Sequence, residues 1–174
     1  MSLIVETGQA GVDSESYASV ADADTYHAKR GNAAWADFDT DVKEAHLRNA
    51  TDYMSQVYGQ RWSGTRVTAT QALDWPRYQA PRKDVPGGYG SLPAYYDYQS
   101  IPVELKNACI LLAFKAASGE LAPDLDRPTT SETVGPVSVT YAAGAREAVK
   151  FRAVDNLLAP LLCSGGMNIK LVRV

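Results

Sequence analysis

Cysteine and histidine are scarce in this sequence, which has two of each among its 174 residues. Cys109 lies within the apolar run ACILLAF, where a thiol usually serves as a small buried side chain. Two such thiols make no disulfide framework, and a reducing compartment such as the cytoplasm suits them. His27 and His46 fall in different predicted helices and in no HExxH or CxxC arrangement. The sequence therefore predicts neither a metal site nor a bound cofactor.

Long apolar runs and an excess of positive charge are also missing. The opening MSLIVETG has an apolar run of only three residues before Glu6, too short for a signal peptide. The longest apolar stretch, near 108–117, is interrupted by Lys115 and is too short to span a bilayer. The net charge is −3, whereas proteins that neutralise many phosphates are usually basic. We therefore expect no membrane partner, and any nucleic-acid contact would need a local basic strip.

Catalytic constellations are absent as well. The sequence has no GxSxG elbow and no SxxK motif. Cys163 lies in LLCSGG, with no histidine after it in the chain to act as its base. The GGYG at 87–90 lacks the GK[ST] ending of a phosphate-binding loop. The acidic cluster at 37–44 coincides with a predicted helix start, where the helix dipole favours negative charge. The sequence thus predicts a protein that is not an enzyme.

Four segments with helical periodicity are present, and they predict a mainly α fold built as a small bundle of about four helices. The first follows Ser19, where Asp22 three residues later gives a capping-box pattern. The predicted helices cover residues 20–30, 41–58, 102–118 and 147–162. The third is the most apolar and is expected to lie at the centre of the bundle.

The segments outside these helices complete the predicted organisation. Residues 1–18 indicate an extended arm, and residues 60–100, rich in proline, glycine and tyrosine, indicate a long central loop. Alternating apolar residues at 132–142 predict a minor β-strand or hairpin near the C-terminus. The last residues, 167–174, alternate again and predict a second strand or an extended tail. We expect one helical domain over 1–174 with extended N- and C-terminal segments.

The block QALDWPR, residues 71–77, is the most distinctive part of the central loop. Pro76 restricts the preceding residue to extended geometry and donates no backbone hydrogen bond. We interpret the block as a corner in which Trp75 packs against the second and third helices, so that truncation to alanine costs about 3–5 kcal/mol. Arg77 is then expected to emerge beyond the corner, available to a carboxylate of this chain or of a neighbouring one.

Basic and aromatic residues interleave in the same loop and allow a different interpretation. The candidate DNA contacts are Arg61, Arg66, Arg77, Arg82 and Lys83. The aromatic residues among them are Trp62, Trp75, Tyr78, Tyr89, Tyr95, Tyr96 and Tyr98. Proteins that bind single strands use such mixtures, because cations track the backbone while aromatic faces stack on bases.

Tyrosine, tryptophan and arginine are also enriched at protein interfaces, so chemistry alone leaves both interpretations open. The predicted anchor and interface residues are Trp62, Trp75, Pro76, Arg77, Tyr95 and Tyr96. For the block at 71–77 we favour the anchor over base stacking.

The order of several blocks resembles a family of small phage and prophage proteins. These blocks are SYASVADADTYHAKRG, KEAHLRNATDYM, RWSGTR, QALDWPR, IPVELKNACILLA and VGPVSVTY, and they run from about Ser16 to Tyr141. The family is described as DnaT-like single-stranded DNA binding proteins. Its members are similar in turn to the helical head–tail connector, or adaptor, proteins of tailed phages.

The connector resemblance implies a structural virion protein. Such a subunit would join a homo-oligomeric ring, commonly dodecameric, below the portal, with the portal and tail-side connector proteins as partners. DNA would be only the passing content of the channel, and the protein would lie in the host cytoplasm before assembly. The family description implies the alternative, a single-stranded DNA-binding protein that grips a strand with its aromatic and basic loop. Neither resemblance supplies catalytic residues.

Overall fold

The computed structural model describes residues 2–82, 85, 94–123, 131–134, 137–140 and 150–163. Its helices in these ranges are α1 (Val20–Ala28), α2 (Thr40–Tyr58), α3 (Val103–Ala116) and α4 (Arg152–Leu158), with the 3-10 turns η1 (Ala33–Trp35) and η2 (Ala159–Leu161). The predicted mainly α fold class is confirmed. None of the helices in the described ranges has both the length and the apolar character needed to cross a membrane.

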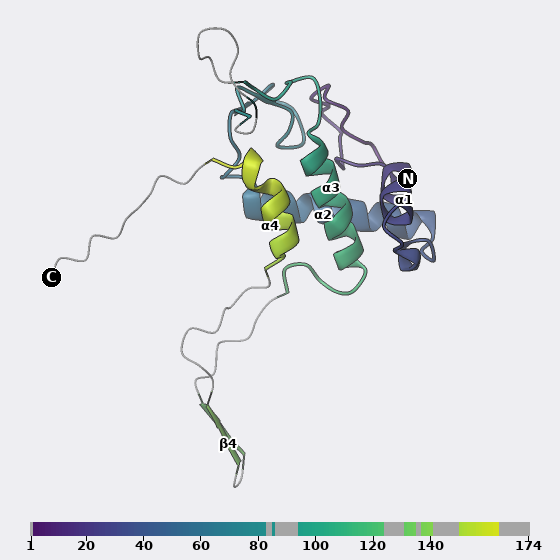
Figure 1. Cartoon of the computed structure of the whole chain (residues 1–174), viewed down its shortest axis with the longest axis vertical. Helices are drawn as coiled ribbons and strands as arrows, with labels where there is room; N and C mark the ends of the chain where they lie inside the picture. Colours follow the sequence, from purple (N-terminus) through teal and green to yellow (C-terminus); the bar gives the residue numbers. More distant parts are fainter. Residues whose placement is uncertain are drawn as a thin grey trace, which may run out of the picture.

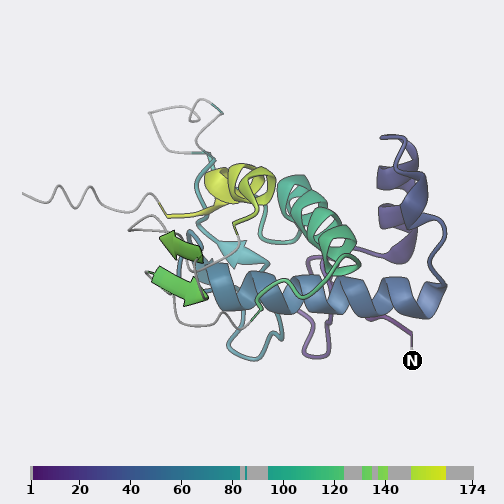
Figure 2. The same ribbon diagram turned by 90° about the horizontal axis from the view of Figure 1, so that it is seen from below.

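The helices are arranged around α2, the longest of them. Figures 1 and 2 show α3 and α4 crossing α2 on one side of it, with α1 next to the N-terminal end of α2. The core fills the space between α2, α3 and α4. Its fully buried apolar side chains include Leu47, Met54, Leu105, Leu112 and Leu158. Leu47 and Met54 in α2, and Leu105 and Leu112 in α3, recur at helical spacing, so each of these helices buries one apolar face.

The helix ends follow local chemistry in two cases and differ from expectation in a third. Asp22 N donates to Ser19 Oγ at 3.0 Å, and Ser19 N donates to the Asp22 carboxylate, so the predicted capping box begins α1. Helix α3 begins directly after Pro102. Helix α4 begins at Arg152, later than predicted, and the described Lys150 before it is not helical.

Two short antiparallel pairs form the β-structure of the described residues. Strand β1 (Thr65–Arg66) pairs with β2 (Arg77–Tyr78) within the central loop, a pair that the periodicity did not indicate. Strands β3 (Ser131–Val134) and β4 (Val137–Thr140) form the expected hairpin near the C-terminus. Figure 1 shows this hairpin apart from the helices. The strand or tail predicted at 167–174 lies outside the described residues.

The N-terminal arm is ordered around one buried carboxylate. Glu6 is almost fully buried, and it accepts the N–H groups of Gly8, Gln9, Ala10 and Gly11 and the hydroxyl of Ser14 at 2.8–3.1 Å. The turn packs closely on the end of the central loop. A Cβ at Gly8, which has φ +106°, would lie 2.1 Å from the carbonyl oxygen of Gln99. Glu6 therefore fixes the shape of the turn that packs on the loop.

Candidate functional site

Trp75 lies inside the protein. Its side chain is fully buried, and its ring makes edge contacts with Trp62 and Tyr96 at centroid distances of 6.2 and 6.0 Å. Pro76 is buried beside it. The predicted burial of Trp75 is confirmed, so neither this indole nor the buried Trp62 offers a face to a nucleotide base.

Hydrogen bonds from distant parts of the chain fix the backbone of this corner. The hydroxyl of Tyr17 accepts the N–H of Asp74 at 3.0 Å and that of Trp75 at 3.3 Å. The side-chain amide of Gln71 donates to the carbonyl of Pro76 at 3.1 Å. Burial raises the pKa of Tyr17 and keeps its hydroxyl protonated. Because the extended corner forms no regular ladder, side chains satisfy its backbone groups.

The prediction that Arg77 emerges toward a carboxylate is wrong. Its guanidinium donates to the carbonyls of Ser63 at 2.8 Å, Gly64 at 2.8 Å and Asp74 at 3.1 Å. The pairing of β1 with β2 brings the carbonyls of Ser63 and Gly64 into reach. The carboxylate of Asp74 pairs instead with Arg66 at 2.6 Å. Arg77 thus serves the internal structure of the corner.

The remaining candidate cations are distributed around the loop. Arg61 is exposed, with its guanidinium carbon 5.6 Å from the ring centre of Tyr58. Arg82 is partly buried, and its guanidinium carbon lies 5.1 Å from the ring centre of Tyr96. Lys83 lies outside the described residues. Arg61 and Arg66 are therefore the candidate cations with the greatest described exposure.

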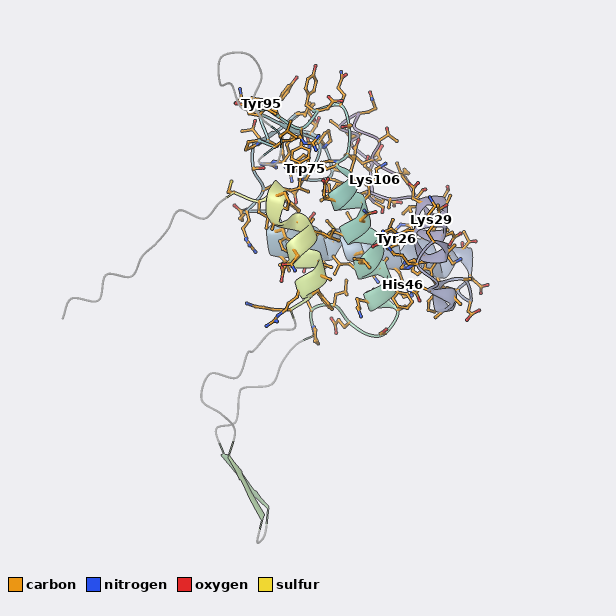
Figure 3. All side chains as sticks on the ribbon, viewed as in Figure 1. Tyr26, Lys29, His46, Trp75, Tyr95 and Lys106 are labelled. Atoms are coloured by element: carbon orange, nitrogen blue, oxygen red, sulfur yellow. The ribbon has the colours of Figure 1, made fainter. Side chains whose placement is uncertain are left out.

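Among the described residues, three exposed tyrosines form the aromatic surface of this region, and Tyr89 lies outside the described residues. Tyr78 and Tyr98 stack with ring centroids 4.5 Å apart and an interplanar angle of 29°. They remain 42% and 40% exposed, and Tyr95 is 48% exposed. Figure 3 shows Tyr95 farther from the helices than Trp75. The sequence indicated that tyrosines gather in this loop, but no local signal indicated which of them stack.

Backbone pairing holds these tyrosines in place. Residues 77–82 run antiparallel to residues 94–98, with Pro81 bridged to Tyr95. Tyr96 N donates to the carbonyl of Ala80 at 2.9 Å, and Arg82 N donates to that of Ala94 at 2.7 Å. We call these two segments the tyrosine ribbon. The ribbon turns Tyr96 inward onto Trp75 and leaves Tyr78, Tyr95 and Tyr98 accessible.

Other chemistry is limited in the described part of the chain. No three residues among its His, Cys, Asp and Glu come together as metal ligands. A cavity of about 530 Å³ lies between α2 and α4. Within it Tyr58 donates to Asp155 at 2.7 Å, and burial raises the pKa of Tyr58. A protonated phenol paired with a carboxylate stabilises the junction of these helices.

These features define a small, mainly helical protein whose long loop presents exposed tyrosines and arginines. The model of one protein family, described as "Putative DnaT-like ssDNA binding protein", matches residues 1–174. The chain belongs to this family, so the predicted family resemblance is confirmed over its whole length. No curated protein and no solved structure matches the chain. The resemblance to phage connectors stays a prediction.

Proposed function

We propose that this protein binds single-stranded DNA without an enzymatic step, and that the tyrosine ribbon is where the bases stack. The observation that most strongly supports this proposal is that Tyr78 and Tyr98 stack on each other and remain exposed. Membership of the DnaT-like family supports the same class of ligand. In this proposal the bases stack on the exposed tyrosines and not on the buried tryptophans that the sequence also offered as candidates.

The chemistry of the ribbon suits a flexible single strand. An exposed ring can take a base on its free face, and stacking is worth about 1–3 kcal/mol per base regardless of sequence. Register places Thr65 opposite Tyr78, so the side chain of Arg66 lies on the other face of the strand pair, where it pairs with Asp74. Because the whole chain carries a net charge of −3, attraction to phosphates depends on local cations such as the exposed Arg61.

Fluorescence anisotropy with a labelled oligo-dT about 16 nucleotides long tests the proposal. The double variant Tyr78→Leu/Tyr98→Leu removes both rings, and we expect its affinity to fall roughly 5- to 150-fold, the equivalent of one stacked base. The matched variant Tyr78→Phe/Tyr98→Phe keeps both rings and should bind within about twofold of wild type. Equal binding by the leucine and phenylalanine variants would refute the ribbon as the stacking surface.

The second candidate function is that of a head–tail connector subunit. One observation favours it: β3 and β4 form a hairpin that Figure 1 shows apart from the helices, as a contact with a neighbouring subunit would require. Under this proposal the buried corner at 71–77 supports the exposed tyrosines as a protein interface. The partners would be the portal, a tail-side connector and further copies of this chain in a ring within the virion.

Co-purification with the cognate portal separates the two functions. A connector should co-elute with the portal, and light scattering should report a ring mass for the complex. Tyr95→Ala should weaken that complex, since exposed tyrosines are frequent interface hot spots. Folded protein that fails to bind the portal but binds oligo-dT would exclude the connector function.

A further inference from the structure

A second feature with the chemistry of a nucleic-acid contact lies away from the tyrosine ribbon, between α1 and α3. It is a groove of about 420 Å³. Its polar and charged lining residues are Asp22, Thr25, Tyr26, Lys29, Arg30, Lys106 and Asn107. Three of these carry positive charge and one carries negative charge. We call this feature the α1–α3 groove.

The helix dipole explains the positions of two of these three cations but not that of the third. Lys29 is the C-cap of α1, and Arg30 follows it, so both lie where the helix dipole favours positive charge. Lys106 lies in the first turn of α3, where the dipole disfavours positive charge. Among the described residues Lys106 forms no ion pair. A cation placed against the dipole and left without a carboxylate suits an external anion.

Arg30 is held in a fixed orientation within the groove. Its guanidinium carbon lies 3.5 Å from the ring centre of Tyr26, and Nη1 donates to the carbonyl of Tyr26 at 3.2 Å. A guanidinium stacked on an aromatic ring keeps its edge available to phosphate oxygens. Fixing the side chain before binding also lowers the entropy lost when a ligand binds.

The groove adjoins the tyrosine ribbon along the chain. Tyr98 precedes Val103, the first residue of α3, by five positions, which span at most about 18 Å. Figure 3 shows Lys106 between Tyr95 and Lys29 in its view. One strand of several nucleotides can therefore reach from the ribbon to the groove.

We infer that the α1–α3 groove binds the phosphate backbone of the same single strand whose bases stack on the tyrosine ribbon. This inference rests on the proposed DNA-binding function and adds its electrostatic part. Lys29, Arg30 and Lys106 contact consecutive phosphates, and Asn107 supplies a neutral donor. In this assignment the three cations of the groove are the local basic strip that an acidic protein needs to bind phosphates.

The salt dependence of oligo-dT binding tests the groove. In the double variant Lys29→Ala/Lys106→Ala we expect about tenfold weaker binding at low salt. Between about 50 and 200 mM NaCl, the slope of log K against log salt should be smaller by about 1.4, that is, about 0.7 for each cation removed. Lys115→Ala is the matched control, because Lys115 is an exposed cation in the last turn of α3 and outside the groove. Circular dichroism of each variant checks that it is folded.

The outcomes separate this inference from the proposed function. Weaker binding with a smaller slope in the groove variant, but not in Lys115→Ala, supports the groove. Wild-type binding with the same slope in all variants overturns the groove and leaves the tyrosine ribbon in place. A folded wild-type protein that binds no oligo-dT at any salt overturns the proposed function, and the groove assignment with it.

Discussion

The hydroxyl of Tyr17 accepts the backbone N–H of Trp75 at 3.3 Å, joining residues that are 58 positions apart. The same oxygen accepts the N–H of Asp74 at 3.0 Å. The hydroxyl of Tyr17, near the N-terminus, therefore accepts both of these buried backbone N–H groups in the corner that supports the tyrosine ribbon. The ribbon depends in this way on the N-terminal segment as well as on its own pairing.

Tyr17→Phe tests this link. The substitution keeps the ring but leaves two buried N–H groups without an acceptor, which should cost about 1–3 kcal/mol in the free energy of unfolding. Urea denaturation followed by circular dichroism measures it. Tyr26→Phe is the control, because Tyr26 is only partly buried and should change stability little. Equal stabilities of the two variants would show that the Tyr17 hydroxyl is not needed at the corner.

Trp75→Ala should be among the most destabilising single changes. The indole is fully buried between Trp62 and Tyr96, so its removal leaves a large cavity and should cost about 3–5 kcal/mol. Tyr95→Ala removes a half-exposed ring from the neighbouring ribbon and should cost less than about 0.5 kcal/mol. Chemical denaturation of both variants gives the comparison. A Trp75→Ala protein as stable as Tyr95→Ala would mean that the indole does not anchor the loop.

Local sequence signals predicted those parts of the fold that depend on neighbouring residues. The Ser19–Asp22 capping box is formed by residues three apart, and it begins α1 as expected. The burial of Trp75 follows from its size and from the proline after it. The apolar spacing predicts that the fourth helix begins at residue 147. The prediction is too early, because α4 begins at Arg152.

The rest of the candidate site depends on long-range contacts. Arg77 turns inward because the pairing of β1 with β2 brings the carbonyls of Ser63 and Gly64 beside it. No sequence pattern near Arg77 indicates that pairing. Lys106 enters the α1–α3 groove only through the packing of α3 near α1. In the sequence Glu6 only interrupts an apolar run, and its role as a hydrogen-bond acceptor depends on the fold of residues 8–14 around it.

Glu6→Gln tests the turn that holds the N-terminal arm. The neutral amide accepts weaker hydrogen bonds, and its NH₂ group meets backbone donors where the carboxylate oxygen was. We expect a loss of about 1–3 kcal/mol in unfolding free energy. Hydrogen exchange should also become faster at the amides of Gly8 and Gly11. Glu15→Gln, which alters a more exposed carboxylate paired with Arg48, should leave those amides protected. Unchanged exchange in Glu6→Gln would contradict the role of its charge.

The stability of the fold should decrease as the solution becomes acidic. Burial lowers the pKa of His27 below the usual value near 6.5, and Arg30 lowers it further, while the backbone of Ile110 and the carboxylate of Asp24 act in the opposite direction. The neutral imidazole packs against Trp35 and Phe114. The unfolded chain therefore binds a proton at higher pH than the folded one does.

It follows that the contribution of His27 is fully present above pH about 6.5 and is lost as pH falls through the lowered pKa. His46 shifts in the same direction through burial and adds to the effect. Urea denaturation at pH about 7.5 and about 5.5 measures the difference, and His27→Gln should show a smaller one because one titrating group is gone. A wild-type protein equally stable at both values, or a His27→Gln variant with an undiminished difference, would mean that His27 titrates in the folded protein as it does in the unfolded chain.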